Sequence, residues 1–262
     1  MRRQVTPTVV AICGSLALGG LMAPDASAAG DGPEITKVVV NGGKNIVVGP
    51  TAVTYFTASV TASDPAGVKE TWLGLWHGSG SYEDQEGAIA RAGELKCTAS
   101  SSTTTTCTSS FQVDANARAF TNEVTNAFAG VWHVSVGAFS GNRVQSGDHR
   151  YSTVKVQRAS RLTVNATPEP VRKGKTVTVT GKLSRANWDT HKYAGYSGRP
   201  VKLQFRKKGS TTYSTIKTVT TSSTGTLKTT VKASVDGYYR YSFAGTSTTP
   251  AVNASGDFID VR

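Results

Sequence analysis

Oxygen-bearing side chains in the first half of the chain have the chemistry of cation ligands. Asp64 begins a turn, and Asn142 and Asp148 fall in a later connection at 140–149. If this half folds in immunoglobulin strand order, these two loops emerge at one pole, where their oxygens could bind calcium, which takes about six to eight such ligands. The alternative is the ordinary use of aspartate to start turns and cap hairpin tips. Calcium is the one cofactor for which the sequence offers candidate ligands.

A long connection at 184–200 combines aromatic and basic side chains. Its candidate ligand-binding residues are Arg185, Trp188, Lys192, Tyr193 and Tyr196. Aromatic faces stack on sugar rings and extended polymers, and neighbouring cations suit a polymer that is anionic. The alternative is that Trp188 and one tyrosine fold back and cover the end of the core.

Catalysis has little support in the sequence. It contains no nucleophile elbow, no HExxH motif and no glycine-rich phosphate loop. His77 and His133 lie beside tryptophans in predicted strands, where histidines are usually packed or hydrogen-bonded. We therefore expect a protein that is not an enzyme. Because signatures of RNA-binding, zinc and helix-turn-helix modules are also missing, we expect no nucleic-acid partner.

Two cysteines remain once the N-terminal apolar segment is set aside. Cys97 and Cys107 face each other across a predicted hairpin between 95–101 and 107–113. An even number of cysteines in an exported chain predicts a disulfide. By the chain-entropy argument, a crosslink that closes so short a loop stabilises the fold by about 3 kcal/mol.

The N-terminus has the pattern of a signal peptide over residues 1–28. Arg2 and Arg3 precede an apolar stretch that ends at Met22, and a small-residue cleavage site ends at Ala28. The apolar stretch is too short for a spanning helix. The pattern predicts a secreted, extracellular protein without a transmembrane segment in its mature chain.

The formal charge of +12 is concentrated in one half of the chain. Residues 1–28 carry a net charge of +1 and residues 29–158 a net charge of −1, whereas residues 159–262 hold seventeen basic and five acidic side chains. Such a field attracts polyanions, which for an exported protein include cell-wall polymers and acidic polysaccharides. We expect these as partners of a monomeric protein.

Period-two alternation runs through both halves of the chain. Near the C-terminus, Tyr239, Tyr241 and Phe243 fall on one face of a strand. Each half shows about seven short strands separated by Gly, Pro, Asn, Asp and Ser, and only 114–129 has helical spacing. This pattern predicts an all-β fold of two tandem immunoglobulin-like β-sandwiches, over residues 33–157 and 162–262, with a short linker between them.

Several segments together resemble a known family. They are NGGKNIVVG, the LWHG that follows a SDPAGV turn, TVNATPEPVRKGKTVTVTGKL, and the ending YRYSFAGTSTTPAVNASGDFIDVR. The chain in this respect resembles secreted actinobacterial proteins built of tandem immunoglobulin-like domains, which are often labelled calcium-binding proteins. The resemblance covers nearly the whole mature chain and implies the same fold, and its label implies calcium without fixing ligand residues.

These observations predict a secreted, non-catalytic binding or adhesion protein of the cell envelope or extracellular space. The basic second domain is expected to contact anionic polymers. The alternative prediction is calcium binding by the loop pole of the first domain.

Overall fold

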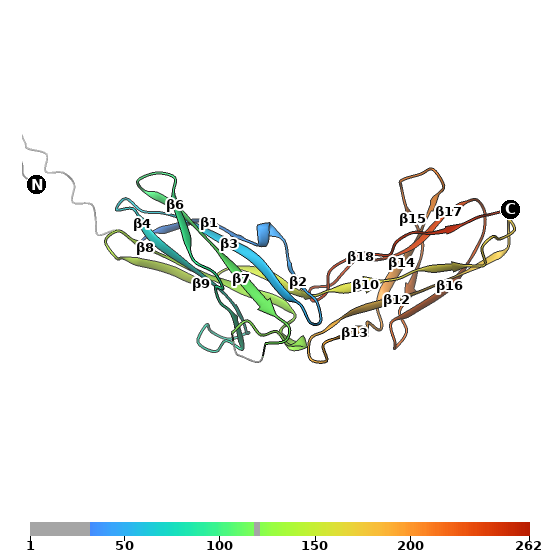
Figure 1. The fold of residues 1–262 in the computed structure, drawn as a ribbon, viewed down its shortest axis with the longest axis horizontal. Helices are drawn as coiled ribbons and strands as arrows, with labels where there is room; N and C mark the ends of the chain where they lie inside the picture. Colours follow the sequence, from blue (N-terminus) through green and yellow to red (C-terminus); the bar gives the residue numbers. More distant parts are fainter. Residues whose placement is uncertain (1–31, 118–120) are drawn as a thin grey trace, which may run out of the picture. The chain divides into compact units, whose positions relative to one another are not determined.

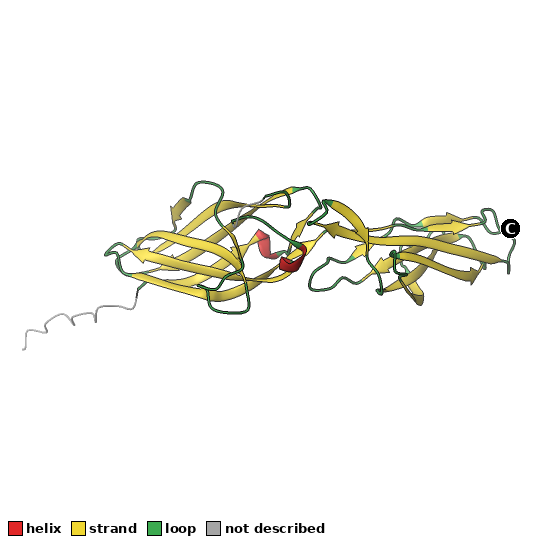
Figure 2. Ribbon diagram, turned by 90° about the horizontal axis from the view of Figure 1, so that it is seen from below, coloured by secondary structure: helices red, strands yellow, loops and turns green. Residues whose placement is uncertain are grey.

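Strands make up nearly all the regular structure of the described part of the chain, residues 32–117 and 121–262 of a computed structural model (Figures 1 and 2). Residues Gly32–Arg262 form one unit, which contains two tandem immunoglobulin-like β-sandwiches, as predicted. The predicted signal peptide, 1–28, lies outside the described residues. No helix within the described ranges has the length and apolar character to cross a membrane.

The first sandwich consists of two sheets. One has the order β1-β3-β7-β6, and its strands are β1 (Glu34–Val40), β3 (Val53–Ser63), β7 (Thr104–Asp114) and β6 (Lys96–Ala99). The other has the order β2-β9-β8-β4-β5, with β2 (Ile46–Val48), β9 (Gln145–Arg158), β8 (Gly130–Ser140), β4 (Val68–His77) and β5 (Gly87–Ile89). A 3-10 helix, η1 (Asn41–Gly43), joins β1 to β2. All pairings are antiparallel except that of β2 with β9.

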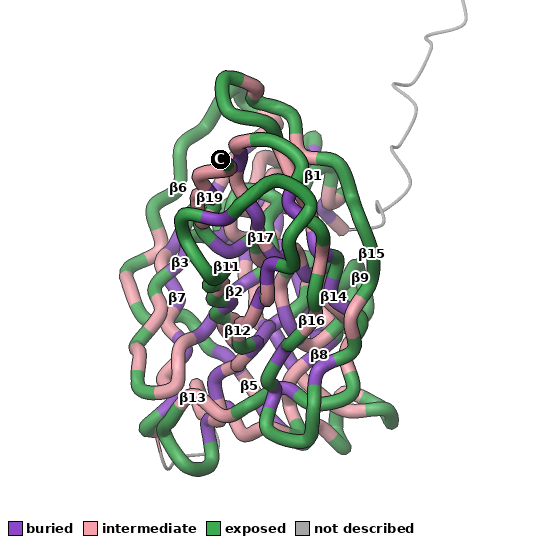
Figure 3. The backbone as a smooth tube through the Cα atoms, turned by 90° about the vertical axis from the view of Figure 1, so that its right-hand side faces the viewer, coloured by how far each residue is buried: buried purple, intermediate pink, exposed green. Residues whose placement is uncertain are grey.

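The core of the first sandwich follows from the alternation of its strands. In β3, Phe56, Ala58 and Val60 are buried while the residues between them are more exposed. Phe56 stacks on Phe111 of the neighbouring strand β7, with ring centroids 5.4 Å apart. Figure 3 shows this alternation of buried and exposed stretches along the strands. Trp132 of β8 is fully buried in the facing sheet, so large apolar side chains from both sheets close the interior.

The second sandwich also has two sheets. One is built around β12 (Thr176–Asn187), which pairs with β10 (Ser160–Leu162), β11 (Asn165–Thr167), β13 (Lys192–Gly195) and β16 (Thr226–Lys232). The other joins β15 (Ser214–Thr220), β14 (Pro200–Lys207), β17 (Gly237–Phe243), β18 (Val252–Asn253) and β19 (Asp257–Ile259). The strands predicted from period-two patterns in this half are therefore confirmed.

Tyr241 joins the two sheets of the second sandwich. Tyr239, Tyr241 and Phe243 are buried along β17, as the alternation predicts. The hydroxyl of Tyr241 donates a hydrogen bond to the carbonyl oxygen of Val179 in β12, 3.0 Å away. A buried tyrosine needs such a partner for its hydroxyl, so this contact fixes the spacing of the facing sheets.

Three connections differ from the sequence predictions. The predicted linker is taken up by strands, since β9 continues to Arg158 and β10 begins at Ser160. The predicted loop 184–200 is largely a hairpin, because β12 extends to Asn187 and its last four residues pair with β13. The helix predicted within 114–129 is wrong for the part described there, which forms only the 3-10 helix η2 (Asn126–Phe128); residues 118–120 lie outside the described ranges.

The predicted disulfide is confirmed. Cys97 and Cys107 are register partners of β6 and β7, with Cα atoms 4.0 Å apart and a bond between their sulfur atoms. Strand β6 is exposed along its whole length, so the crosslink ties an exposed edge strand to β7 in addition to their backbone pairing. Its stabilising effect should come mainly from the restricted unfolded chain.

Removal of this disulfide by Cys97→Ser with Cys107→Ala is expected to lower the free energy of unfolding by about 3 kcal/mol. Alanine suits position 107 because that side chain is only 1% exposed, and a serine hydroxyl buried there would add its own cost. Urea denaturation of the variant and of the oxidised wild type measures the difference. Reduced wild type should match the variant, and equal stability of oxidised wild type and variant would contradict the prediction.

Candidate functional site

Trp188 lies in the core and not on a binding surface. Its side chain is 1% exposed and belongs, with Ala186, to the apolar cluster that includes Trp132 of the first sandwich. The indole Nε1 donates a hydrogen bond to the carbonyl oxygen of Val48, 3.2 Å away. The structure therefore gives Trp188 the core-covering position of the alternative interpretation, because β12 and β13 carry it inward at their hairpin tip.

Asn126, which sequence reasoning missed, holds this hairpin tip. Its Oδ1 accepts a hydrogen bond from the backbone N–H of Trp188 at 3.0 Å, and its Nδ2 donates to Oδ1 of Asn187 at 2.7 Å. The backbone N–H of Asn126 donates to a carboxylate oxygen of Asp189 at 3.0 Å. Asn126 begins the 3-10 turn η2, and no pattern in the sequence predicted its contact with the hairpin.

Tyr193 and Lys192 lie on β13. Tyr193 is half-buried and packs against the same apolar cluster. The guanidinium carbon of Arg161 lies 3.7 Å from the centre of its ring, a cation–π contact. Lys192 is exposed, opposite Asn187 in the β12–β13 register. Tyr193 therefore stabilises the hairpin by packing, whereas Lys192 lies on its exposed side.

Arg185 and Tyr196, two of the predicted ligand-binding residues, line a common pocket of about 340 Å³. Arg158 from the end of β9 and Arg199 from the turn before β14 also line it, as does the loop at 246–248. The guanidinium carbons of Arg185 and Arg199 lie 3.9 Å and 4.6 Å from the centre of the Tyr196 ring. Two arginines of the 184–200 segment therefore contact one buried tyrosine, and Arg158 from the first half of the chain lines the same pocket.

The charges in this pocket repel one another. Burial, and after it the neighbouring Arg185 guanidinium, lower the pKa of Arg158 to about 10. Burial also lowers the pKa of Arg185, to which Arg199 adds repulsion. Burial alone would raise the pKa of Tyr196, but the Thr246 hydroxyl and the two nearby guanidinium groups outweigh it, so that this pKa is lowered. The whole arrangement favours negative charge.

The predicted calcium ligands Asp64 and Asp148 are not brought together. Asp148 lies within β9 opposite Val136, which pairs on its other side with Leu73 of β4. Asp64 precedes the start of β4 at Val68, and five residues of strand span about 16 Å. The prediction assumed a loop over 140–149. Strand β9 already begins at residue 145, so Asp148 lies within the sheet and away from the turn at Asp64.

Asn142 does lie near the turn that Asp64 begins, because the N–H of Gly141 donates to the carbonyl oxygen of Gly67 at 2.8 Å. The carboxylate of Asp64, however, accepts a hydrogen bond from the backbone N–H of Ala66 at 2.7 Å, the Asx turn of the alternative interpretation. In the part of the chain that the structure describes, no group of three or more His, Cys, Asp or Glu side chains could hold a metal ion. Calcium binding remains a prediction that this geometry does not favour.

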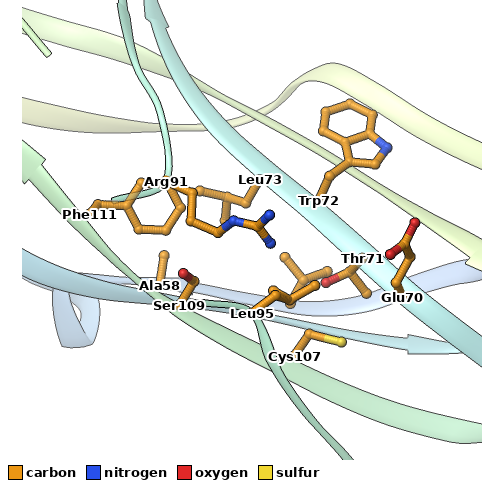
Figure 4. A pocket seen from close by; sticks show the side chains of 11 residues that line it. Ala58, Glu70, Thr71, Trp72, Leu73, Arg91, Leu95, Cys107, Ser109 and Phe111 are labelled. Carbon is orange, nitrogen blue, oxygen red and sulfur yellow. The ribbon is translucent and has the colours of Figure 1, made fainter. Parts of the chain in front are cut away.

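A second pocket, of about 280 Å³, lies beside β4 and β7 in the first sandwich (Figure 4). The side chain of Arg91 points along it, from Phe111 towards the end at Glu70. Its walls supply a carboxylate from Glu70 and hydroxyls from Thr71 and Ser109, while no histidine lines it. Its polar lining thus combines one carboxylate, two hydroxyls and the guanidinium of Arg91.

The histidines of the first sandwich form an aromatic cluster. His133 stacks on Trp76 at 4.3 Å between ring centroids, and its Nε2 lies 3.2 Å from Nη1 of Arg150. Burial and the positive charge of Arg150 lower the pKa of His133. His149, which sequence reasoning left out, shares a hydrogen bond of 2.7 Å with the Ser135 hydroxyl. Packing and hydrogen bonding engage these rings, as predicted for His133.

No protein-family model matches the chain, and no curated protein sequence does either. Among solved structures, the I-band fragment I67-I69 from titin is similar over 89% of this chain and 66% of its own length, with 12% identity and a TM-score of 0.32. The D00-D0 domain of intimin is similar over 85% of this chain and 99% of its own length, with 12% identity and a TM-score of 0.27. A putative membrane anchored protein from Corynebacterium diphtheriae is similar over 86% of this chain and 53% of its own length, with 12% identity and a TM-score of 0.30.

The chain spans less than two thirds of the length of the titin fragment and of the Corynebacterium protein. At these identities and scores, the assignment of two immunoglobulin-like sandwiches rests on the strand order and register of the chain itself.

Proposed function

We propose that the chain is an exported, non-catalytic binding or adhesion protein of the cell envelope or extracellular space. Its basic second sandwich would contact anionic polymers, such as wall polymers or acidic polysaccharides. The observation that carries this proposal is the surplus of unpaired cations on that sandwich. Calcium binding by the first sandwich is the alternative, and no arrangement of the described residues favours it.

Few of the cations in the second sandwich have an acidic partner. Residues 159–262 hold seventeen basic and five acidic side chains. Among the described residues of this region, the ion pairs are Lys208 with Asp236, at 3.6 Å, and Arg262 with Asp260, at 2.9 Å. Most of the positive charge therefore faces solvent without a partner and attracts polyanions over about a Debye length.

Three exposed lysines lie on one outward sheet face. Lys228 and Lys232 alternate with the inward-facing Leu227 and Val231 of β16. Lys182 of β12 pairs with Thr226, which lies on the same outward face. We call Lys182, Lys228 and Lys232 the lysine face. It runs along two paired strands, as contact with an extended polymer requires.

The second sheet of this sandwich carries cations stacked on aromatic rings. The guanidinium carbon of Arg206 lies 3.8 Å from the centre of the Tyr238 ring, and that of Arg240 lies 3.8 Å from the centre of the Tyr213 ring. Arg206 pairs with Tyr238 in the β14–β17 register. Cations interleaved with rings suit polymers that combine sugars with negative charge. These side chains therefore support the proposal, although they lie outside the binding segment predicted at 184–200.

The triple variant Lys182→Gln, Lys228→Gln, Lys232→Gln is expected to bind anionic polymer about a hundredfold more weakly at low salt. The basis is about 1 kcal/mol for each basic residue near an anionic surface. Affinity for isolated wall polymer and for heparin, measured over a range of salt concentrations, checks this. The matched control replaces the exposed Lys37, Lys44 and Lys69 of the first sandwich with glutamine and should bind like wild type. Equal loss in both variants, or wild-type binding that persists at high salt, would contradict the proposal.

A further inference from the structure

We propose that the pocket formed by Arg158, Arg185 and Arg199 is a binding site for a phosphate or sulfate group. The site goes beyond the contact of polymers with the lysine face, because it would recognise a single tetrahedral oxyanion. A free phosphate or sulfate ion and a phosphate monoester carried by a polymer present the same tetrahedral oxygens and a similar charge to it.

The first argument is the absence of a counterion among the described residues. None of the salt bridges found there includes Arg158, Arg185 or Arg199. Asp189 is the acidic residue whose charge raises the pKa of Arg158, but its carboxylate accepts hydrogen bonds from Asn126. Three guanidinium groups crowded into one partly buried pocket repel one another, and a dianion between them would relieve that repulsion.

The second argument is that the pocket retains hydrogen-bond donors without good partners. The Nε of Arg199 is buried and has no partner among the described residues. Arg185 reaches the hydroxyls of Thr248 and Thr249 only at 3.4 Å, which is long for a charged donor. A guanidinium has about five N–H donors in a planar fork, so the remaining N–H groups of Arg185 and Arg199 can still donate hydrogen bonds to an oxyanion.

The third argument is that the donors are held in place before any ligand arrives. Tyr196 is 5% exposed, its ring contacts both Arg185 and Arg199, and it packs edge-to-face with Phe243 at 5.9 Å between ring centroids. Its backbone N–H donates to Leu183, and its carbonyl oxygen accepts from the Thr221 hydroxyl at 2.7 Å. A fixed aromatic ring thus orients two cations, which lowers the entropic cost of binding.

Arg158 supplies the third, fixed side of the pocket. Its Nε donates to the carbonyl oxygen of Ala186 at 2.6 Å and its backbone N–H to that of Thr248 at 3.0 Å. A carboxylate has two oxygens and one negative charge, whereas phosphate and sulfate offer more oxygens and a charge near −2. Three cations around a pocket of about 340 Å³ therefore match the tetrahedral dianions best.

The test is a titration of the full chain with inorganic phosphate and with sulfate, in which chloride is exchanged so that ionic strength stays constant. We expect the Tm to rise by about 5 °C once phosphate is well above its Kd and to continue rising with the logarithm of its concentration. Arg185→Gln and Arg199→Gln should each weaken phosphate binding at least tenfold by calorimetry. The matched control is Arg161→Gln, because Arg161 also stacks on a tyrosine but does not line the pocket.

A Tm that responds to phosphate no more than to chloride would overturn the site, and this result needs no variant to fold. Equal loss in Arg161→Gln would also overturn it, because the effect would then follow bulk charge. The lysine-face variant should keep its phosphate response, so the polymer proposal and the pocket can fail separately. Free phosphate that displaces bound wall polymer would identify the ligand as a group on that polymer, whereas polymer binding unaffected by phosphate would identify a free anion.

Discussion

Replacing Trp188 with alanine is expected to lower the free energy of unfolding by about 3–5 kcal/mol. The indole is 1% exposed and packs in the apolar cluster that includes Trp132. Its removal exposes that cluster and leaves a cavity, and it also removes the hydrogen bond to Val48. The carbonyl oxygen of Val48 keeps a second donor, the N–H of Ala159 at 2.9 Å, so the loss should come mainly from packing.

The Trp188→Ala variant should also make the two sandwiches unfold in separate transitions. Trp188 is carried by the second sandwich but is buried with the core of the first, so it links their stabilities. Urea unfolding of Trp188→Ala, followed by far-UV circular dichroism and by aromatic fluorescence, should show two transitions in place of one. Trp188→Phe, which keeps most of the apolar volume, should lose less than half as much stability. Unchanged unfolding of Trp188→Ala would refute the core position.

Most of the fold could be predicted because burial in sheets repeats every two residues. The alternation of Tyr239, Tyr241 and Phe243 predicted β17 directly, and the hairpin predicted between 95–101 and 107–113 is the pairing of β6 with β7. The hairpin of β12 and β13 was missed because its residues are mostly polar. Its signal was the inward pair Ala186 and Trp188, which continues the alternation of β12.

The arginine pocket could be predicted only in part. Arg185 and Tyr196 lie in one segment, and their types indicated binding of an anion. Arg199 belongs to the same segment, whereas Arg158 joins them only because β9 ends beside the turn before β14, a tertiary contact that no local pattern contains. The calcium prediction failed to bring Asp64 and Asp148 together for a related reason. Where β9 begins depends on its pairing with β8, which decides how far Asp148 lies from the pole.

Replacing Tyr241 with alanine is expected to cost about 3–4 kcal/mol of unfolding free energy. Tyr241 is fully buried, and its ring lies so close to Gly181 of the facing sheet that a Cβ there would come within 2.8 Å of it. Alanine would leave a cavity between the sheets. Tyr241→Phe keeps the ring and loses only the hydrogen bond to Val179, so it should cost about 1 kcal/mol. Equal costs for the two variants, measured by urea denaturation, would contradict the packing argument.

The same residue makes stability depend on alkaline pH. Burial raises the pKa of Tyr241 to about 12, whereas a tyrosine in the unfolded chain titrates near its usual value of about 10. Above that value the unfolded chain releases a proton that the folded chain retains, so the free energy of unfolding falls as the pH rises. Tyr241→Phe removes this titrating group and should make the free energy of unfolding fall less steeply with pH. The remaining, smaller fall would come from Tyr239, whose pKa burial also raises. A slope identical to that of wild type would mean that the Tyr241 hydroxyl reaches water, and the bridge between the sheets would then be open.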